Sequence, residues 1–124
     1  MGVSDFYITN RTKEKADNLK NLFDNINVIN WGEIKQADIY LNTTSVGLNE
    51  NDSLDLDFSN IKNKLFYDVI YSPEKTKFLL DAENNQNMIS NGKMMFIYQA
   101  QASFKIWTGL EPSVNDTEIN LLND

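Results

Sequence analysis

A cluster of basic residues near the start of the chain is the first feature that points to chemistry. Arg11, Lys13 and Lys15 lie within five positions of a chain whose formal net charge is -7. Thr12 is a typical helix N-cap, so Lys13 and Lys15 are expected in the first turn of a helix. Cations are unfavourable there, because the helix dipole is positive at its N-terminus. We therefore expect a bound phosphate at this place. The alternative is an ordinary solvated start of a helix.

Composition narrows the classes of function. The 124 residues include no cysteine and no histidine. Disulfides, thiolate chemistry and the commonest metal ligand are thereby excluded, and no metal site is expected. The negative charge argues against nucleic acid as a partner. No apolar run approaches the roughly 20 residues that span a bilayer, and the N-terminus lacks the pattern of a secretion signal. We expect a cytoplasmic protein with no membrane partner.

Short aromatic and β-branched stretches alternate with segments of helical spacing. Strands are predicted at 6–10, 28–31, 39–43, 65–70 and 87–90. Helices are predicted at 13–23, 34–37 (a single turn), 76–84, 93–108 and 114–122. This alternation predicts one α/β domain over residues 1–124, with a mostly parallel sheet of about five strands. Ligands bind at the carboxyl ends of such strands, which selects the segments 10–15, 42–48, 69–73 and 91–95.

These segments carry recognisable motifs. Asn-Arg-Thr occupies 10–12, and the longer stretches are ADIYLNTTSVGL (37–48), FYDVIYSPEKTKFL (66–79) and NGKMMFIYQAQASFKIWTG (91–109). Together and in this order they resemble the shikimate dehydrogenase family. The corresponding family patterns are Asn-Arg-Thr, Asn-x-Thr-Ser-x-Gly-Met, Asp-x-x-Tyr-x-Pro-x-x-Thr-x-Phe-Leu and Gly-x-x-Met-x-x-x-Gln…Phe-x-x-Trp-x-Gly. The resemblance extends over nearly the whole chain.

The resemblance implies a partial, doubly wound Rossmann-like domain that binds NADP. Its parent enzyme would reduce 3-dehydroshikimate to shikimate. The residues that match the family's cofactor and substrate contacts fall into four groups. These are, for the adenosine 2′-phosphate, Asn10, Arg11, Thr12 and Lys15; for the ribose and pyrophosphate, Thr43 and Ser45; for the nicotinamide half, Val69, Gly92 and Met95; and for the substrate, Tyr71 and Gln99.

The residue types are compatible with these roles. Gly92 opens a predicted helix, where a missing side chain lets a flat ring approach the backbone. Gln99 offers a donor and an acceptor on an otherwise apolar helix face, unless it is only a satisfied polar residue at the helix margin. Tyr71 has a comparable alternative as a core aromatic. Met94 replaces a second family glycine, which narrows the expected nicotinamide pocket, and Leu48 replaces the usual Met.

Other family features are missing from these 124 residues. The family's Gly-rich phosphate loop has no counterpart, because all five glycines are isolated. The family's catalytic Lys and Asp belong to a substrate domain that this sequence does not contain. We therefore predict no catalytic residue here and an inactive chain in isolation. The absent loop follows the central first strand, so strands 6–10 and 39–43 should either pair directly or pair with another copy in a homodimer.

Three functions remain open on this reading. The first is the C-terminal NADP-binding portion of a shikimate dehydrogenase. The second is a non-catalytic nucleotide- or protein-binding module derived from that domain. The third is a related enzyme on the same scaffold, such as a quinate/shikimate or aminoshikimate dehydrogenase.

Overall fold

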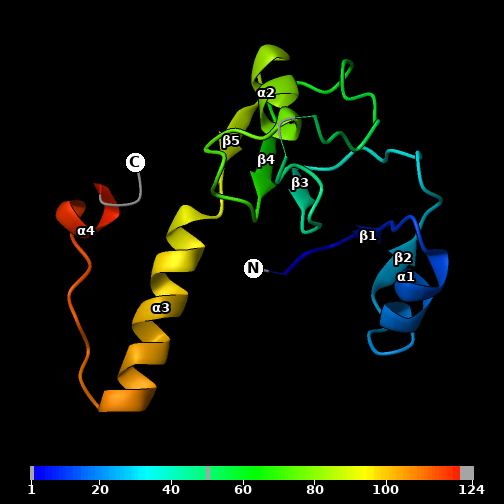
Figure 1. The fold of residues 1–124 in the computed structure, drawn as a ribbon. Helices are drawn as coiled ribbons and strands as arrows, with labels where there is room; N and C mark the ends of the chain where they lie inside the picture. Colours follow the sequence, from blue (N-terminus) through cyan, green and yellow to red (C-terminus); the bar gives the residue numbers. More distant parts are fainter. Residues whose placement is uncertain (1, 50, 121–124) are drawn as a thin grey trace. The chain divides into compact units, whose positions relative to one another are not determined.

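Strands and helices alternate along the chain in the computed structural model, which describes residues 2–49 and 51–120 (Figure 1). The chain divides into two compact units, of which the first ends at Gln36 and the second begins at Ala37. The elements in chain order are β1 (Phe6–Ile8), α1 (Lys13–Lys20), β2 (Ile26–Val28), β3 (Ile39–Asn42), β4 (Leu65–Asp68), α2 (Lys77–Asn84), β5 (Met88–Ser90), α3 (Lys93–Thr108) and α4 (Asp116–Asn120).

The first unit is a single strand–helix–strand motif. β1 and β2 pair in parallel, with Phe6 opposite Ile26 and Ile8 opposite Val28. The connection between two parallel strands must cross over, and α1 is that crossover. Ala16 of α1 is 1% exposed and Ile26 of β2 is 8% exposed, so these two residues mark the small core of the unit.

The second unit contains a three-stranded parallel sheet in the order β3-β4-β5. β4 is the middle strand, and its side chains at Phe66 and Asp68 are fully buried. α2 links β4 to β5 and buries Phe78, Leu79 and Ala82. The middle strand therefore ends at a buried residue, and Ile70 in the segment after it is also buried.

Aromatic rings form the core of the second unit. The rings of Tyr40 and Phe66 stack with centroids 4.7 Å apart. Phe58 and Phe78 contact Phe66 at 5.2 Å each, with Phe58 edge-on to it. Offset and edge-to-face contacts of this kind add to the gain from burying the rings. Phe58 belongs to the long segment between β3 and β4, so this irregular segment packs against the sheet through the Phe58 ring.

The strand order confirms the predicted fold class. A doubly wound sheet has the order 3-2-1-4-5-6, and β2-β1 and β3-β4-β5 correspond to its 3-2 and 4-5-6 parts. Among the described residues no strand corresponds to strand 1. The predicted direct pairing of the strands at 6–10 and 39–43 is wrong, because β1 and β3 lie in different sheets. Each sheet is built around its own crossover helix, and the segment 29–38 between β2 and β3 contains no helix.

Most element boundaries follow the prediction closely. The helix at 93–108 has the predicted bounds, and Gly109 ends it in the left-handed region at φ 72°. The helix predicted at 13–23 ends earlier, at Lys20, and leaves Leu22 74% exposed. The turn predicted at 34–37 is not helical, and β2 begins before the predicted 28–31. α4 is shorter than 114–122, and positions 121–122 lie outside the described residues.

Candidate functional site

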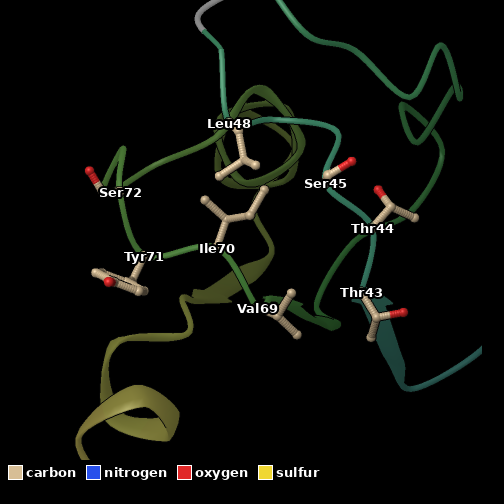
Figure 2. Close-up of a pocket in the computed structure, with 8 residues that line it drawn as sticks. All are labelled: Thr43, Thr44, Ser45, Leu48, Val69, Ile70, Tyr71 and Ser72. Atoms are coloured by element: carbon tan, nitrogen blue, oxygen red, sulfur yellow. The ribbon is translucent and has the colours of Figure 1, made fainter.

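A pocket of about 560 Å³ lies at the carboxyl ends of β3 and β4. Figure 2 shows that its walls come from two segments, one following each strand. The segment after β3 contributes polar side chains and one leucine, and the segment after β4 contributes a mixed set. The lining residues are Thr43, Thr44, Ser45, Leu48, Val69, Ile70, Tyr71 and Ser72.

A buried carboxylate holds the two strand ends together. Asp68, the last residue of β4, is 0% exposed. Its Oδ2 accepts hydrogen bonds from Asn42 Nδ2 at 3.0 Å and from Thr76 Oγ1 at 2.7 Å. Its Oδ1 accepts from the backbone N–H of Ile70 at 3.0 Å. Buried polar groups are tolerated when they are satisfied in this way, and here the bonds join β3, β4 and the start of α2.

Asn42 also shapes the wall that follows β3. Its Oδ1 accepts from the backbone N–H of Thr44 at 3.0 Å and from the Thr44 hydroxyl at 2.8 Å. Its Nδ2 donates to the carbonyl of Val46 at 3.0 Å. A side chain that bonds its own backbone two residues on replaces a regular turn. The segment that carries Thr43 and Ser45 is therefore fixed by the same residue that bonds to Asp68.

The two walls touch at Gly47. Its φ of 118° lies where side chains are strained. A Cβ there would also lie 3.0 Å from Thr76 Cγ2 and 3.3 Å from Ile70 Cδ1. On the outer side, Asp52 accepts backbone hydrogen bonds from Asn49 and Gly47, and these lower the pKa of its carboxyl below the ordinary value. Gly47 thus lets the loop approach Thr76 and Ile70, and the Asp52 carboxylate closes the loop on itself.

Four of the residues predicted from the sequence lie together in this pocket. They are Thr43, Ser45, Val69 and Tyr71. The other four lining residues were not predicted as site residues, although each lies in a segment that the strand-end rule selected. The rule locates the segment, and the side chains that face the cavity depend on how the loop turns.

Gly92 lies directly behind the pocket wall. An ideal Cβ at this position would lie 1.9 Å from the carbonyl oxygen of Val69. The N–H of Gly92 also donates to the carbonyl of Ile70 at 3.2 Å. The glycine thus lets α3 begin in contact with the end of β4, which is a structural reason additional to the predicted approach of a ring.

The remaining predicted residues of α3 lie outside the pocket lining. Met95 is 44% exposed, and Gln99 is also exposed. The ring of Phe96, between them, stacks on Tyr71 with centroids 4.8 Å apart and an interplanar angle of 26°. Ile97 is the buried residue of α3 among the described residues.

The basic cluster belongs to the first unit and is exposed. Among the described residues Arg11, Lys13 and Lys15 form no ion pair. Asn10 Oδ1 accepts from the backbone N–H of Thr12 at 2.8 Å, which turns the chain into α1. In contrast, five other lysines of this acidic chain do pair with carboxylates: Lys35, Lys64, Lys75, Lys77 and Lys105.

Two further observations concern the described residues as a whole. Across 2–49 and 51–120 no cluster of three or more acidic side chains is arranged to hold a metal ion. In the same ranges no helix has the length and apolar character needed to cross a bilayer.

The fold and the pocket define a class. The chain is part of a Rossmann-like α/β protein whose pocket lies at the strand ends where this class binds nucleotides. Residues 95–118 match the family described as shikimate 5′-dehydrogenase C-terminal domain. The NADP(+) shikimate dehydrogenase of Pelagibacter ubique is 46% identical over 122 residues, which cover 98% of this chain and 46% of that protein.

Solved structures agree with this relationship. The shikimate dehydrogenase of Aquifex aeolicus has a TM-score of 0.79 and 32% identity, covering 96% of this chain and 44% of its own. A shikimate dehydrogenase solved in complex with NADP+ has a TM-score of 0.78 and 27% identity, covering 97% and 46%. The chain belongs to the shikimate dehydrogenase family. It spans less than half the length of the relatives that it matches.

Proposed function

We propose that residues 1–124 form the C-terminal NADP-binding portion of a shikimate dehydrogenase. The complete enzyme would act in the cytoplasm in aromatic amino acid biosynthesis, reducing 3-dehydroshikimate to shikimate with NADPH. The observation that carries the proposal is the pocket at the ends of β3 and β4. Four predicted contact residues line it together, in a chain 46% identical to an NADP(+) shikimate dehydrogenase.

The basic cluster suits the phosphate that distinguishes NADP from NAD. Arg11, Lys13 and Lys15 are exposed and unpaired among the described residues, so their donors are available at the start of α1. Arg offers a planar fork of donors to a phosphate monoester. The buried Thr9 Oγ1 has no hydrogen-bond partner among the described residues, and it lies in the same segment. We assign Asn10, Arg11, Thr12 and Lys15 to the 2′-phosphate.

The pocket suits the other half of the cofactor. The hydroxyls of Thr43 and Ser45 would bond the ribose and pyrophosphate. Val69 would contact the nicotinamide ring, with Gly92 and Met95 beside it. When bound, NADPH would supply the hydride for carbonyl reduction. These residues would hold and orient the cofactor.

Substrate contacts and proton transfer are divided between this chain and the rest of the enzyme. The phenol of Tyr71 and the amide of Gln99 would bond hydroxyl and carboxylate groups of the substrate. No residue of this chain is assigned the proton transfer. By resemblance, that role belongs to a Lys and an Asp of the family's substrate domain.

A non-catalytic binding module is the second candidate. The chain spans less than half of its relatives, so binding without turnover would agree with the same pocket. The two candidates differ in their outcome with substrate, because only a complete shikimate dehydrogenase would oxidise NADPH when 3-dehydroshikimate is added.

The proposal is tested by removing a cation just before α1 and comparing the result with removal of a cation at the end of α1. In a complete enzyme that carries these residues, Arg11→Ala should weaken NADPH binding by about 10- to 100-fold, because it removes charge-assisted hydrogen bonds. NADH binding should not change. Lys20→Ala is the matched control, since Lys20 is an exposed lysine in the last turn of the same helix.

Isothermal titration with each nucleotide measures both affinities. Equal losses for NADPH and NADH in Arg11→Ala would show that Arg11 does not recognise the 2′-phosphate. If the unmodified enzyme bound neither nucleotide, the proposed function would be wrong and a protein-binding module would be favoured.

A further inference from the structure

Tyr71 forms part of the pocket wall without support from a regular element. It follows β4 in a segment that is neither strand nor helix, and its side chain is half-buried. A phenol on such a segment can rotate about two side-chain bonds unless a neighbour restrains it. A substrate hydrogen bond to the phenol therefore requires something that fixes the ring.

Phe96 provides that restraint. Its ring lies 4.8 Å from the ring of Tyr71 and nearly parallel to it, at 26°. The contact covers one face of the ring of Tyr71, a residue that lines the pocket. Offset stacking of aromatic rings is favourable beyond the area it buries.

The backbone fixes the helix that carries Phe96. The N–H of Phe96 donates to the carbonyl of Gly92 at 2.9 Å, and the N–H of Gly92 donates to the carbonyl of Ile70 at 3.2 Å. The missing side chain of Gly92 lets the Val69 carbonyl approach it closely. The first turn of α3 and the segment that carries Tyr71 are therefore joined through their backbones.

Phe96 is also not a buried core residue. It is 37% exposed, whereas its neighbour Ile97 is 8% exposed and fills the core position on α3. Among the described residues its ring contacts no aromatic ring other than Tyr71.

We infer that Phe96 is a positioning residue that holds the Tyr71 ring so that its hydroxyl faces the substrate. The inference rests on the proposed function, because it assigns the cavity beside Tyr71 to the substrate. It adds that the residue at position 96 influences substrate affinity without touching the substrate.

The experiment uses the complete enzyme and the variant Phe96→Leu, which keeps an apolar side chain and removes the ring. The KM for 3-dehydroshikimate should rise about fivefold, which corresponds to loss of one aromatic stack. The KM for NADPH should not change. Tyr98→Leu is the matched control, because Tyr98 is a 56% exposed aromatic residue on the same helix that makes no ring contact among the described residues.

A double-mutant cycle separates positioning from general packing. In a Tyr71→Ala background, Phe96→Leu should have no further effect on the substrate KM, because the ring that it positions is gone. A fivefold rise that persists in that background would overturn the inference. So would an equal rise in both KM values.

Fluorine NMR of the enzyme labelled with 3-fluorotyrosine reports the stack independently of activity. The Tyr71 signal, identified by its loss in Tyr71→Phe, should move in Phe96→Leu and stay in place in Tyr98→Leu. A Tyr71 signal unmoved by Phe96→Leu would show that the stack is absent. Failure of the unmodified enzyme to reduce 3-dehydroshikimate would instead refute the proposed function, and with it the substrate role of the assembly.

Discussion

Gly92 is the residue at which the backbone leaves least room for a side chain. A methyl group at this position would overlap severely with the Val69 carbonyl oxygen, at 1.9 Å. Neither partner is the flexible end of a side chain, so relief requires a shift of β4 or of α3. Val69 follows directly after β4 and Met95 lies on α3, so the consequence of a substitution would extend to the proposed site.

We predict that Gly92→Ala lowers the free energy of unfolding by about 1–3 kcal/mol, the usual range for an overpacked site. Thermal unfolding followed by circular dichroism measures this loss. Gly2→Ala is the matched control, because a Cβ at Gly2 would meet nothing within 4 Å. Equal melting temperatures for the unmodified protein and Gly92→Ala would contradict the close approach.

For individual residues, the sequence predicts where the site residues lie better than which contacts they make. Thr43, Ser45, Val69 and Tyr71 could be predicted because they follow strands, where parallel sheets place their ligands. The stack between Phe96 and Tyr71 could not be predicted. The stack depends on how α3 is rotated about its own axis. The sequence does not specify this rotation, because apolar residues lie on several faces of the helix.

Thr76 connects β4 to α2 through its side-chain hydroxyl. Its hydroxyl donates to Asp68 at 2.7 Å and accepts from the N–H of Leu79 at 3.4 Å in the first turn of α2. The residue is 2% exposed. One hydroxyl therefore caps a helix and satisfies the buried carboxylate that joins β3 to β4.

Replacing Thr76 by Val keeps the shape of the side chain and removes both hydrogen bonds. We predict a loss of about 1–3 kcal/mol in stability, because Asp68 keeps its burial with one donor fewer. Thr76→Ser keeps the hydroxyl and should lose less than Thr76→Val. Chemical denaturation of the two variants measures the difference, and a valine variant as stable as the serine variant would contradict the network.

Elements were predictable where their residues follow a clear period. The core segment around Phe58 and Ile61 could not be predicted, because it is irregular and is buried by its contacts with the sheet. The predicted helix at 13–23 is too long, because Leu22 and Phe23 continue its apolar spacing although α1 ends at Lys20. The structure leaves them 74% and 55% exposed.

The described residues contain two separate parallel sheets, one in each unit. β1 and β3 each pair on one side only among the described strands. Exposed apolar residues lie along these edges, with Ile39 53% and Leu41 56% exposed. Unpaired edges of this kind recruit other strands. The strand-order rule predicts that these two edges lack a partner strand, whereas the sequence does not indicate which strand would pair with them.

We propose that the isolated chain associates through these edges, with a homodimer as the simplest product. Sedimentation of the isolated chain should give at least twice the mass of the monomer at high concentration. Leu41→Lys should reduce the association, because charge on an edge strand opposes pairing. Leu80→Lys on α2, where Leu80 is 43% exposed, should not. A chain that stays monomeric at all concentrations would exclude this association.

The most direct test of the central claim is NADPH oxidation with 3-dehydroshikimate, followed by absorbance. A complete enzyme that carries residues 1–124 as its C-terminal part should turn over. The isolated 124-residue chain should not, because it contains none of the residues assigned to proton transfer. Turnover by the isolated chain, or no turnover by a folded complete enzyme that binds NADPH, would contradict the account.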